Sequence, residues 1–305
     1  MSLSIAPVRT DSILAEFAGE VTGLTCRDPL SPDQVAAIEA GMDRFGVLVY
    51  RGQHLTDEEQ LAFTLHFGEI EGKGRGRGSG HIHFRTDDQA RKLGQGMGDF
   101  SNIDGKGKPL PENSRAYMFK LADRLWHSDS SFRPTPAKYS LLSARSVPSW
   151  GGRTEFADMR AAYDALDDRT RAEVEDLVCL HSQIFSREKV GFGEMSEAER
   201  AEFKPVRQRL VRTHPVTGRK SLFLSSHAGQ IEGWSIPESR MFLHDLAEFA
   251  TQPQFVYSHP WTVGDMVVWD NRVTMHRGRR FDPAEPRDVR QTRLAGHAPT
   301  IEQLD

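Results

Sequence analysis

The N-terminal part of the chain alternates helical and strand patterns. Apolar residues recur at helical spacing between Ser31 and Phe45, and Ser31 before Pro32 is typical of an N-cap and a first helical residue. Gly46 is typical of a helix end, and the four apolar residues VLVY after it predict a buried strand. Thr56 predicts the cap of a second helix through DEEQLAFTLHFG. We therefore expect helix, strand, helix.

From Gly72 to about Gly107 the apolar periodicity is lost and glycine recurs every few residues. This composition supports neither a helix nor a central strand, so a long mobile loop is expected. Such a loop inside a compact domain is either a functional lid or a disordered, solvated insert, and both interpretations stay open. As a lid, it would offer His81, His83 and Arg85 to an anionic ligand.

The rest of the chain carries short apolar runs bounded by Gly, Pro or Asn, a pattern that indicates many short strands. These runs are YSLLSARSV, TEFADM, RLVRTH, SLFLSS, QFVYSH, DMVVWD, VTMH and RQTRLA. Helical patterns interrupt them at Asp167–Leu180 and Pro237–Phe249. This order favours a mainly β fold, a jelly roll with flanking helices. The chain shows no internal repeat and no linker, so one domain over residues 1–305 is expected.

The composition is that of an ordinary globular protein, with 38% hydrophobic and 27% charged residues. A net charge of −4 offers nucleic acid no overall attraction, and no apolar run approaches the length of a membrane helix. The N-terminus lacks the pattern of a signal peptide, so a cytoplasmic location is expected. Cys26 and Cys179 form no CxxC pair, so a metal would be bound by nitrogen and oxygen.

The run LWHSDSSF places His127 and Asp129 two residues apart, and on a strand such residues point to the same face. A third ligand must come from elsewhere, and His276 in VTMHRGRR is the best candidate. Two imidazoles and a carboxylate form the facial triad of iron(II) oxygenases. Alone, an HxD is expected by chance in a chain with 12 histidines, and His276 would more often be a structural residue.

Several longer motifs around this pair change that balance. WHSDSSF, PAKYSLLSA, GGRTEFADMRAAYDAL and GDMVVWDNRVTMHRGRR occur in one order, and together they resemble the family of taurine dioxygenase and 2,4-dichlorophenoxyacetate dioxygenase. The likeness covers most of the chain and looks closest to the aryloxyacetate branch. It implies a double-stranded β-helix of the cupin-like kind, with iron(II) held by His127, Asp129 and His276.

The resemblance also implies a cosubstrate, 2-oxoglutarate. Thr154 in GGRTEF and Arg287, eleven residues past His276, match the pair that holds the distal carboxylate of 2-oxoglutarate in the family. A guanidinium suits this task because it binds a carboxylate through two parallel hydrogen bonds. Trp269 matches a tryptophan that lines the cosubstrate pocket, and a core position for the same residue is compatible with that role.

Other residues near the distal histidine have less specific roles. Asp270 and Asn271 are expected to form the turn that directs His276 to the metal, since both residue types favour turns. Arg277, Arg279 and Arg280 form either a positive rim that attracts anions or a solvated face paired to acids such as Asp282. Neither alternative is favoured by the sequence.

One position departs from the family pattern. Members commonly carry a second arginine about fifteen residues beyond the distal histidine, which holds the anionic group of the substrate, but this chain has Gln291 there. Arg290 precedes it, and a one-residue offset within a strand turns a side chain to the opposite face. Arg290, Gln291, His81 and His83 are the candidate substrate residues.

The resemblance implies an enzyme that needs iron(II), 2-oxoglutarate and O2, with ascorbate as a reductant in vitro. The expected reaction hydroxylates a small organic anion, such as an aryloxyalkanoate, and cleaves its ether to a phenol and a glyoxylate-type product, with succinate and CO2. Alternatives are the same chemistry on a sulfonate or sulfate ester, a non-catalytic jelly-roll binding protein, and a zinc hydrolase. Homo-oligomers occur in the family, which makes an oligomer an expectation by analogy.

Overall fold

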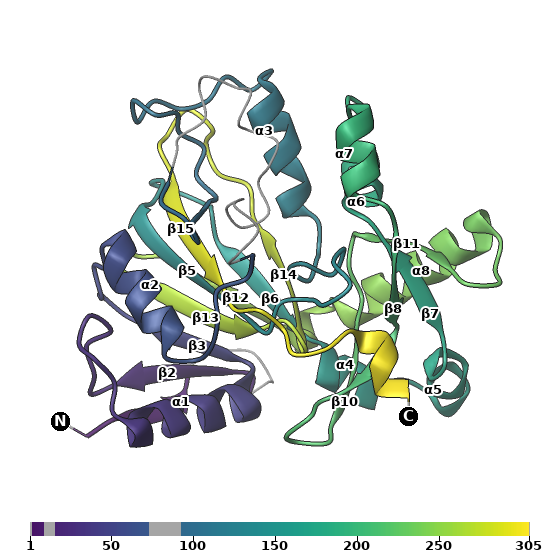
Figure 1. Cartoon of the computed structure of the whole chain (residues 1–305), viewed down its shortest axis with the longest axis horizontal. Helices are drawn as coiled ribbons and strands as arrows, with labels where there is room; N and C mark the ends of the chain where they lie inside the picture. The colour runs from purple at the N-terminus through teal and green to yellow at the C-terminus, as the bar shows by residue number, and fades with distance from the viewer. Residues whose placement is uncertain (1, 9–15, 73–92, 305) are drawn as a thin grey trace.

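Two facing β-sheets form the centre of the molecule (Figure 1). The computed structural model describes residues 2–8, 16–72 and 93–304. The larger sheet has seven strands, all antiparallel except the β2–β3 pair. Its strands, in spatial order, are β1 (Ser4–Pro7), β2 (Ala18–Thr22), β3 (Val47–Tyr50), β13 (Met266–Asp270), β5 (Tyr139–Ser146), β15 (Asp288–Arg293) and β4 (Gly98–Asp99).

The smaller sheet has three antiparallel strands and carries the distal histidine. Its order is β12 (Val256–His259), β6 (Thr154–Asp158) and β14 (Thr274–Gly278). Phe156 and Tyr257 of this sheet pack against Val267 and Trp269 of the larger one, and all four side chains are buried. Since side chains alternate along a strand, the neighbours of these residues point to the opposite face of each sheet.

Helices cover the outer face of each sheet. On the larger sheet, α1 (Pro32–Phe45) and α2 (Asp57–Leu65) contribute to a core with Leu141 and Val268. Outside the smaller sheet, α4 (Met159–Asp164) and α8 (Ile236–Ala250) contribute to a second core with Met275. Each sheet is therefore buried on both faces, which places the site residues of β14 and β15 between layers.

The remaining elements lie around the smaller sheet and above the edge of the larger one (Figure 1). They are α3 (Arg115–Lys120), the 3-10 helix η2 (Leu121–Arg124), α5 (Asp168–Val174), β7 (Val178–His181), α6 (Gln183–Lys189), α7 (Glu197–Glu202), β8 (Val206–Arg209), β9 (Val211–Thr213), β10 (Lys220–Leu222), β11 (Ala228–Ile231), η3 (Pro253–Phe255) and η4 (Thr300–Leu304).

The local signals of the N-terminal part are confirmed. Ser31 and Thr56 each accept a hydrogen bond from the backbone of the third helical residue, and Gly46 ends α1 at a φ of 76°. The strand VLVY is fully buried between β2 and β13. These elements follow from short-range chemistry that the sequence states directly.

Two predicted segments are corrected. The helix expected over Asp167–Leu180 ends at Val174, because Val178–His181 pairs with β8 and β11 as strand β7. The loop expected from Gly72 to Gly107 is not structureless throughout, since Gly98–Asp99 pairs with β15 and both Met97 and Ile103 are buried. Cross-strand pairing with distant residues decides both segments.

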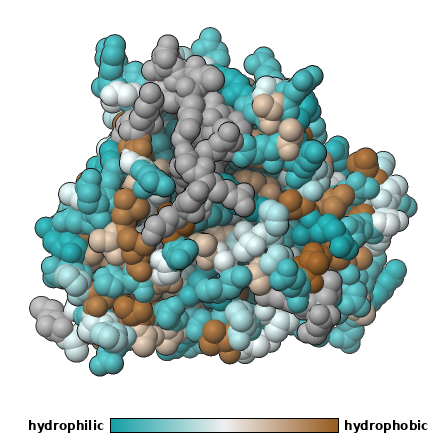
Figure 2. Space-filling model, viewed as in Figure 1, coloured by the Kyte–Doolittle hydropathy of each residue, from teal (hydrophilic) through white to brown (hydrophobic). Residues whose placement is uncertain are grey.

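The face of the molecule in Figure 2 is mainly hydrophilic, with hydrophobic residues in small groups. Within the described ranges, no helix has the length and apolar character needed to cross a membrane.

Candidate active site

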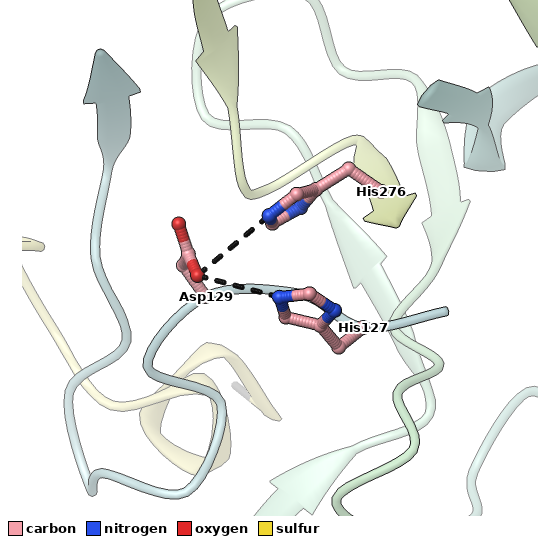
Figure 3. Close-up of side chains that lie close together, drawn as sticks. All are labelled: His127, Asp129 and His276. Carbon is pink, nitrogen blue, oxygen red and sulfur yellow. Dashed lines mark ion pairs between the residues drawn. The ribbon is translucent and has the colours of Figure 1, made fainter. Parts of the chain in front are cut away.

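His127 and His276 are joined by their backbones. The amide of His127 donates to the carbonyl of His276 at 2.9 Å, and the amide of His276 donates back at 2.8 Å. Among the described residues, His127 forms only this isolated bridge to His276. The expectation that the HxD pair lies on a strand is therefore wrong. After the HxD pair the chain turns sharply at Ser130, which has a φ of 56°. The carboxylate of Asp129, just before this turn, points toward both imidazoles (Figure 3).

The three side chains direct their donor atoms to one point (Figure 3). Nε2 of His127 and Nε2 of His276 each lie 3.8 Å from Oδ1 of Asp129. Nδ1 of His127 is 2.8 Å from the carbonyl of Leu125, which makes Nδ1 the protonated nitrogen and leaves Nε2 free to bind a metal. All three side chains are buried.

The protonation states suit metal binding. Burial lowers the pKa of His276 to about 3, with a further contribution from the adjacent His127, so His276 is neutral at pH 7. Burial opposes ionisation of Asp129, but neighbouring charges, which include Arg293, and a hydrogen bond from Ser140 outweigh it and lower the pKa of this carboxyl. A neutral imidazole and an ionised carboxylate are the forms that bind metal ions.

A layer of polar side chains fixes the Asp129 carboxylate. Nε2 of Gln291 donates to Oδ2 of Asp129 at 2.8 Å, and Oγ of Ser140 donates to the same oxygen at 2.7 Å. Asn271 donates to Ser140 at 2.9 Å and accepts from the backbone amide of Asp129 at 3.3 Å. Asn271 therefore does more than form a turn, because it also connects the metal-binding segment to β5.

Arg290 and Gln291, the two candidate substrate residues of β15, point to opposite faces of the sheet, as neighbouring residues on a strand do. Gln291 is buried and lines the cavity beside the triad. Arg290 points to the other face, where Nη1 contacts Asp57 at 2.5 Å and Nη2 contacts Asp288 at 3.3 Å. The structure therefore contradicts a place for Arg290 in the site. His81, His83 and Arg85 lie outside the described residues.

A cavity of about 100 Å³ adjoins the two histidines. Apolar side chains form much of its wall, and Thr154, Trp269, Arg287 and Gln291 contribute polar or aromatic groups. The apolar members are Phe100, Leu110, Tyr117, Leu121, Leu142 and Phe281. The cavity is thus lined by residues that are more than 130 positions apart in the sequence.

Arg287 is a buried cation on the wall of this cavity. Burial is the main influence on its guanidinium and lowers its pKa to about 10, so it keeps its charge at pH 7. Within the described part of the chain, no carboxylate lies within ion-pair distance of Arg287. A buried charge without a partner is unfavourable, so Arg287 is suited to bind an anionic ligand.

Thr154 and Trp269 line the cavity from different sheets, Thr154 on β6 and Trp269 on β13. Oγ1 of Thr154 accepts a hydrogen bond from Nε1 of Trp261 at 2.9 Å, which leaves the threonine hydroxyl proton free to donate. Nε1 of Trp269 donates to Oδ1 of Asn271 at 3.0 Å, and the Trp269 ring lies 4.6 Å from that of His276. Trp269 therefore acts on the site through its ring, because its only polar hydrogen is already bound.

The arginines after His276 are partly paired. Arg277 and Arg279 both approach the carboxylate of Glu155, at 2.8 and 3.5 Å, and Glu155 takes the place of the expected Asp282. Arg280 is exposed. Arg277 and Arg279 are thus paired to an acid, and Arg279 also lines the cavity described above, so neither of the two alternatives describes all three residues.

Three site residues were missed in the sequence: Ser140, Arg293 and Glu71. Arg293 lies two positions after Gln291 on β15, and its Nη1 is 3.9 Å from Oδ1 of Asp129 while its Nε is 3.1 Å from Glu71. Strand alternation could have placed Arg293 on the face of Gln291. Ser140 and Glu71 carry no local signal, since only the pairing of distant strands brings them here.

Comparisons with known proteins agree with one family across nearly the whole chain. The chain is 43% identical to alpha-ketoglutarate-dependent 2,4-dichlorophenoxyacetate dioxygenase of Burkholderia sp. (strain RASC) over 280 residues, 92% of each protein. It is 37% identical to (S)-phenoxypropionate/alpha-ketoglutarate-dioxygenase of Sphingobium herbicidovorans, with 92% of this chain and 93% of that protein covered.

A solved structure gives the same result. The structure of AAD-2 in complex with Mn(II) and N-oxalylglycine is 52% identical, covers 98% of this chain and 99% of its own, and superposes with a TM-score of 0.87. The family described as taurine catabolism dioxygenase TauD, TfdA family matches residues 6–293. This chain therefore belongs to the TauD, TfdA family of dioxygenases.

Proposed function

We propose that this protein is an iron(II)- and 2-oxoglutarate-dependent dioxygenase that oxidises aryloxyalkanoates. The observation that carries the proposal is one cavity in which His127 and His276 lie beside an unpaired, buried Arg287. Metal ligands alone would suit many reactions, and an anion site alone would suit many binding proteins. Their combination fits a reaction in which a dianionic keto acid binds next to a metal.

The donor set fits iron(II). Two neutral imidazole nitrogens and one carboxylate oxygen form the facial triad of non-haem iron oxygenases, which leaves positions for other ligands. Gln291 and Ser140 occupy Oδ2 of Asp129 and leave Oδ1 toward the imidazoles. The protein thus presents one oxygen of Asp129 to the metal.

Thr154 and Arg287 are the proposed holders of the distal carboxylate of 2-oxoglutarate. The guanidinium supplies parallel donors to a carboxylate, and the hydroxyl proton of Thr154 supplies a third because Trp261 leaves it free. A diacid held at this end presents its keto-acid end toward the triad. The protein's contribution here is orientation.

The chemistry balances for an aryloxyacetate. One O2, one 2-oxoglutarate and one aryloxyacetate give succinate, CO2, a phenol and glyoxylate, because hydroxylation beside the ether oxygen produces a hemiacetal that collapses. Bound iron supplies the oxidising power that amino-acid side chains lack. The protein positions the carbon beside the ether oxygen, and the apolar wall of Phe100, Leu110 and Tyr117 accepts the aryl ring and excludes water.

The relatives support aryloxyalkanoates as the substrate class, because two of them are named for 2,4-dichlorophenoxyacetate and phenoxypropionate. The apolar cavity wall supports the same class. Sulfonates and sulfate esters remain the second candidates.

We also propose that the two facing sheets form a double-stranded β-helix within a single domain. The shared core of the sheets, the antiparallel pairing of β5, β13 and β15, and the family match over residues 6–293 support this interpretation. Cytoplasmic location and homo-oligomerisation stay predictions.

A panel of anions tests the proposed function. Aryloxyacetates, aryloxypropionates, sulfonates and sulfate esters are assayed for succinate formation that depends on the added anion, with iron(II), ascorbate and 2-oxoglutarate. We expect turnover with the aryloxyalkanoates and none when zinc replaces iron. Turnover only with sulfonates or sulfate esters would contradict the substrate class, and an absence of succinate with every anion would also contradict it while leaving the cofactor assignment unchanged.

A further inference from the structure

A second guanidinium lines the active-site cavity without an ion-pair partner. Arg124 is the last residue of η2, three positions before His127, and its half-buried side chain contributes to the cavity wall. Among the described residues, Arg124 has no ion-pair partner; its Cζ lies 5.9 Å from the centroid of the Phe281 ring, and its charge acts on the nearby Arg287. Arg287 approaches the same ring, at 5.6 Å. Lys120 and Arg279 also line this cavity, but Lys120 donates to the backbone carbonyl of Ser101 at 2.6 Å and Arg279 approaches Glu155. Arg124 and Arg287 are thus two guanidiniums of the wall that have no ion-pair partner among the described residues.

The carboxylate nearest to Arg124 in sequence has another partner. Asp123 also lines the cavity, but its Oδ1 lies 3.6 Å from Nη2 of Arg187, and no ion pair joins Asp123 to Arg124 within the described ranges. Arg187 is itself buried, and its guanidinium lies 4.1 Å from the centre of the Phe119 ring. Asp123 thus forms its ion pair with Arg187 and also acts on Arg287 through space, while Arg124 has no ion-pair partner among the described residues.

Three other polar residues near the site already interact with other side chains. Gln291 stands where the family pattern has the substrate-binding arginine, but its amide donates to Asp129 and carries no charge. Arg290 contacts Asp57 and Asp288 on the opposite face of β15. Arg279 approaches Glu155. Arg293, which shares the face of Gln291 on β15, approaches Glu71 at 3.1 Å and does not line the cavity, so β15 offers the cavity no cation at the expected position.

We propose that Arg124 holds the carboxylate of the organic substrate, and that this anchor lies on η2 in place of β15. The proposal rests on the proposed function. Two carboxylates must be held in one cavity, the distal carboxylate of 2-oxoglutarate and that of the substrate, and two unpaired guanidiniums are present. Arg287, buried in the wall that Thr154 also lines, suits the cosubstrate, and the more accessible Arg124 suits a molecule that binds after it.

The apolar residues nearest to Arg124 match such a substrate. Leu121 lies one helical turn before it, and Tyr117 and Phe281 belong to the same wall. An aryloxyalkanoate combines an aromatic ring with a carboxylate a few bonds away, and this wall combines apolar side chains with a cation whose Cζ lies 5.9 Å from the centroid of the Phe281 ring. Arg124 is therefore a specificity-determining residue that selects anionic aryl ethers over neutral ones.

Paired ligands separate the charge contact from packing. Protein loaded with Mn(II) and 2-oxoglutarate is titrated calorimetrically with 2,4-dichlorophenoxyacetate and with its neutral analogue 2,4-dichlorophenoxyacetamide. For Arg124→Leu we expect the affinity for the acid to fall about 10- to 100-fold, the loss of a charge-assisted contact, while that for the amide changes by less than about twofold. Arg124→Lys should recover part of the loss.

Arg280→Leu is the matched control, since it removes an equal charge from an exposed position that does not line the cavity. It should bind the acid as wild type does. The affinity for 2-oxoglutarate, measured in the same Mn(II)-loaded proteins, should be unchanged in Arg124→Leu and also shows that this variant is folded.

Three results would overturn the proposal. Equal loss of acid and amide affinity would show a packing role, loss of 2-oxoglutarate affinity would assign Arg124 to the cosubstrate, and unchanged acid affinity would remove Arg124 from the site. If Arg124→Leu binds the acid as wild type does, and wild type turns over aryloxyacetates, only the role of Arg124 is contradicted and the proposed function is not. A wild-type protein that binds neither ligand would contradict the proposed substrate class as well.

Discussion

The side chain of Gln291 orients one of the three proposed metal ligands, Asp129. Its amide and the Ser140 hydroxyl both donate to Oδ2 of Asp129, at 2.8 and 2.7 Å. With that oxygen saturated, Oδ1 faces the two imidazoles. Groups that orient a ligand in this way commonly change metal affinity when they are removed.

Replacing Gln291 by leucine should weaken metal binding. Gln291→Leu removes one of the two donors to Oδ2, so we expect the affinity for Mn(II) to fall about 10-fold, as for other residues that orient metal ligands. Mn(II) titration followed by electron paramagnetic resonance measures this. Arg290→Leu, on the other face of the same strand, should keep the wild-type affinity, and equal affinities in all three proteins would contradict the role of Gln291.

Arg287 and Thr154 should affect 2-oxoglutarate and not the metal. Arg287→Leu is expected to weaken 2-oxoglutarate binding to the Mn(II)-loaded protein by about 10- to 100-fold, and Thr154→Val by about 3- to 10-fold, because a neutral hydrogen bond is weaker. Calorimetric titration of 2-oxoglutarate measures both. If Arg287→Leu binds 2-oxoglutarate as wild type does, the cosubstrate site lies elsewhere.

For individual residues, the sequence predicts which side chains form the candidate metal site better than it predicts which residues hydrogen-bond to them. The HxD motif with His276 predicts the three donor groups that the structure brings together, and strand alternation separates Arg290 from Gln291. The hydrogen bonds of Asp129 come from Ser140, eleven positions away, and Gln291, more than 160 positions away. Such contacts depend on tertiary pairing, which a local pattern does not contain.

The turn between β13 and β14 is the element that directs His276. Asp270 is fully buried, and it accepts hydrogen bonds from Nη2 of Arg272 at 2.6 Å and from its Nε at 2.9 Å. His214 approaches the same carboxylate at 3.4 Å. Burial opposes ionisation of Asp270, but Arg272 and His214 outweigh it and hold the pKa of this carboxyl well below its usual range.

Asp270→Asn should destabilise the fold at neutral pH. It leaves Arg272 without its main partner, so the free energy of unfolding at pH 7 should fall by about 3–5 kcal/mol, as for broken buried ion pairs. The lowered pKa stabilises the wild type fully above about pH 4, and this contribution is lost as the pH falls further. The difference between the proteins should therefore shrink in acid.

Urea unfolding at pH 7 and pH 3 measures this difference. Asp245→Asn, on the exposed surface of α8, is the control and should change stability by less than about 0.5 kcal/mol. A deficit of Asp270→Asn that is equal at both pH values would contradict the assignment of an ionised Asp270.

Elements with strong local signals are predicted well, and those decided by pairing are not. The capping boxes of α1 and α2 need only neighbouring residues. Val178–His181 follows helical residues without a break in its apolar pattern, and only its pairing with β8 and β11 makes it a strand. The HxD segment shows the same effect. Its sequence predicts a strand, but its pairing with the described residues is limited to a single bridge between His127 and His276.

At the scale of the whole molecule, buried neutral histidines make stability depend on pH. His181 on β7 is fully buried, stacks on Phe223 with a centroid distance of 5.6 Å, and has no hydrogen-bond partner for either ring nitrogen among the described residues. Burial lowers the pKa of His181 to about 3. The unfolded chain binds this proton near pH 6.5, so the contribution to stability is complete above that pH and decreases as the pH falls toward 3.

His181→Phe should make the protein less sensitive to acid. Between pH 6 and pH 4 the slope of the unfolding free energy against pH should decrease by about 1.4 kcal/mol per pH unit, the contribution of one proton. The pKa of His227 is lowered in the same way, so part of the dependence remains. Denaturant unfolding across this range measures the slope, and a slope equal to that of wild type would contradict a neutral, buried His181.

The central claim is that the chain couples oxidation of an aryloxyalkanoate to decarboxylation of 2-oxoglutarate. Reaction of the iron(II) enzyme with 2,4-dichlorophenoxyacetate under ¹⁸O2, followed by mass spectrometry of the products, tests it most directly. We predict one ¹⁸O atom in each succinate and an unlabelled oxygen in an equal amount of 2,4-dichlorophenol, because the ether oxygen stays with the ring. Unlabelled succinate, or a phenol that carries ¹⁸O, would contradict the account.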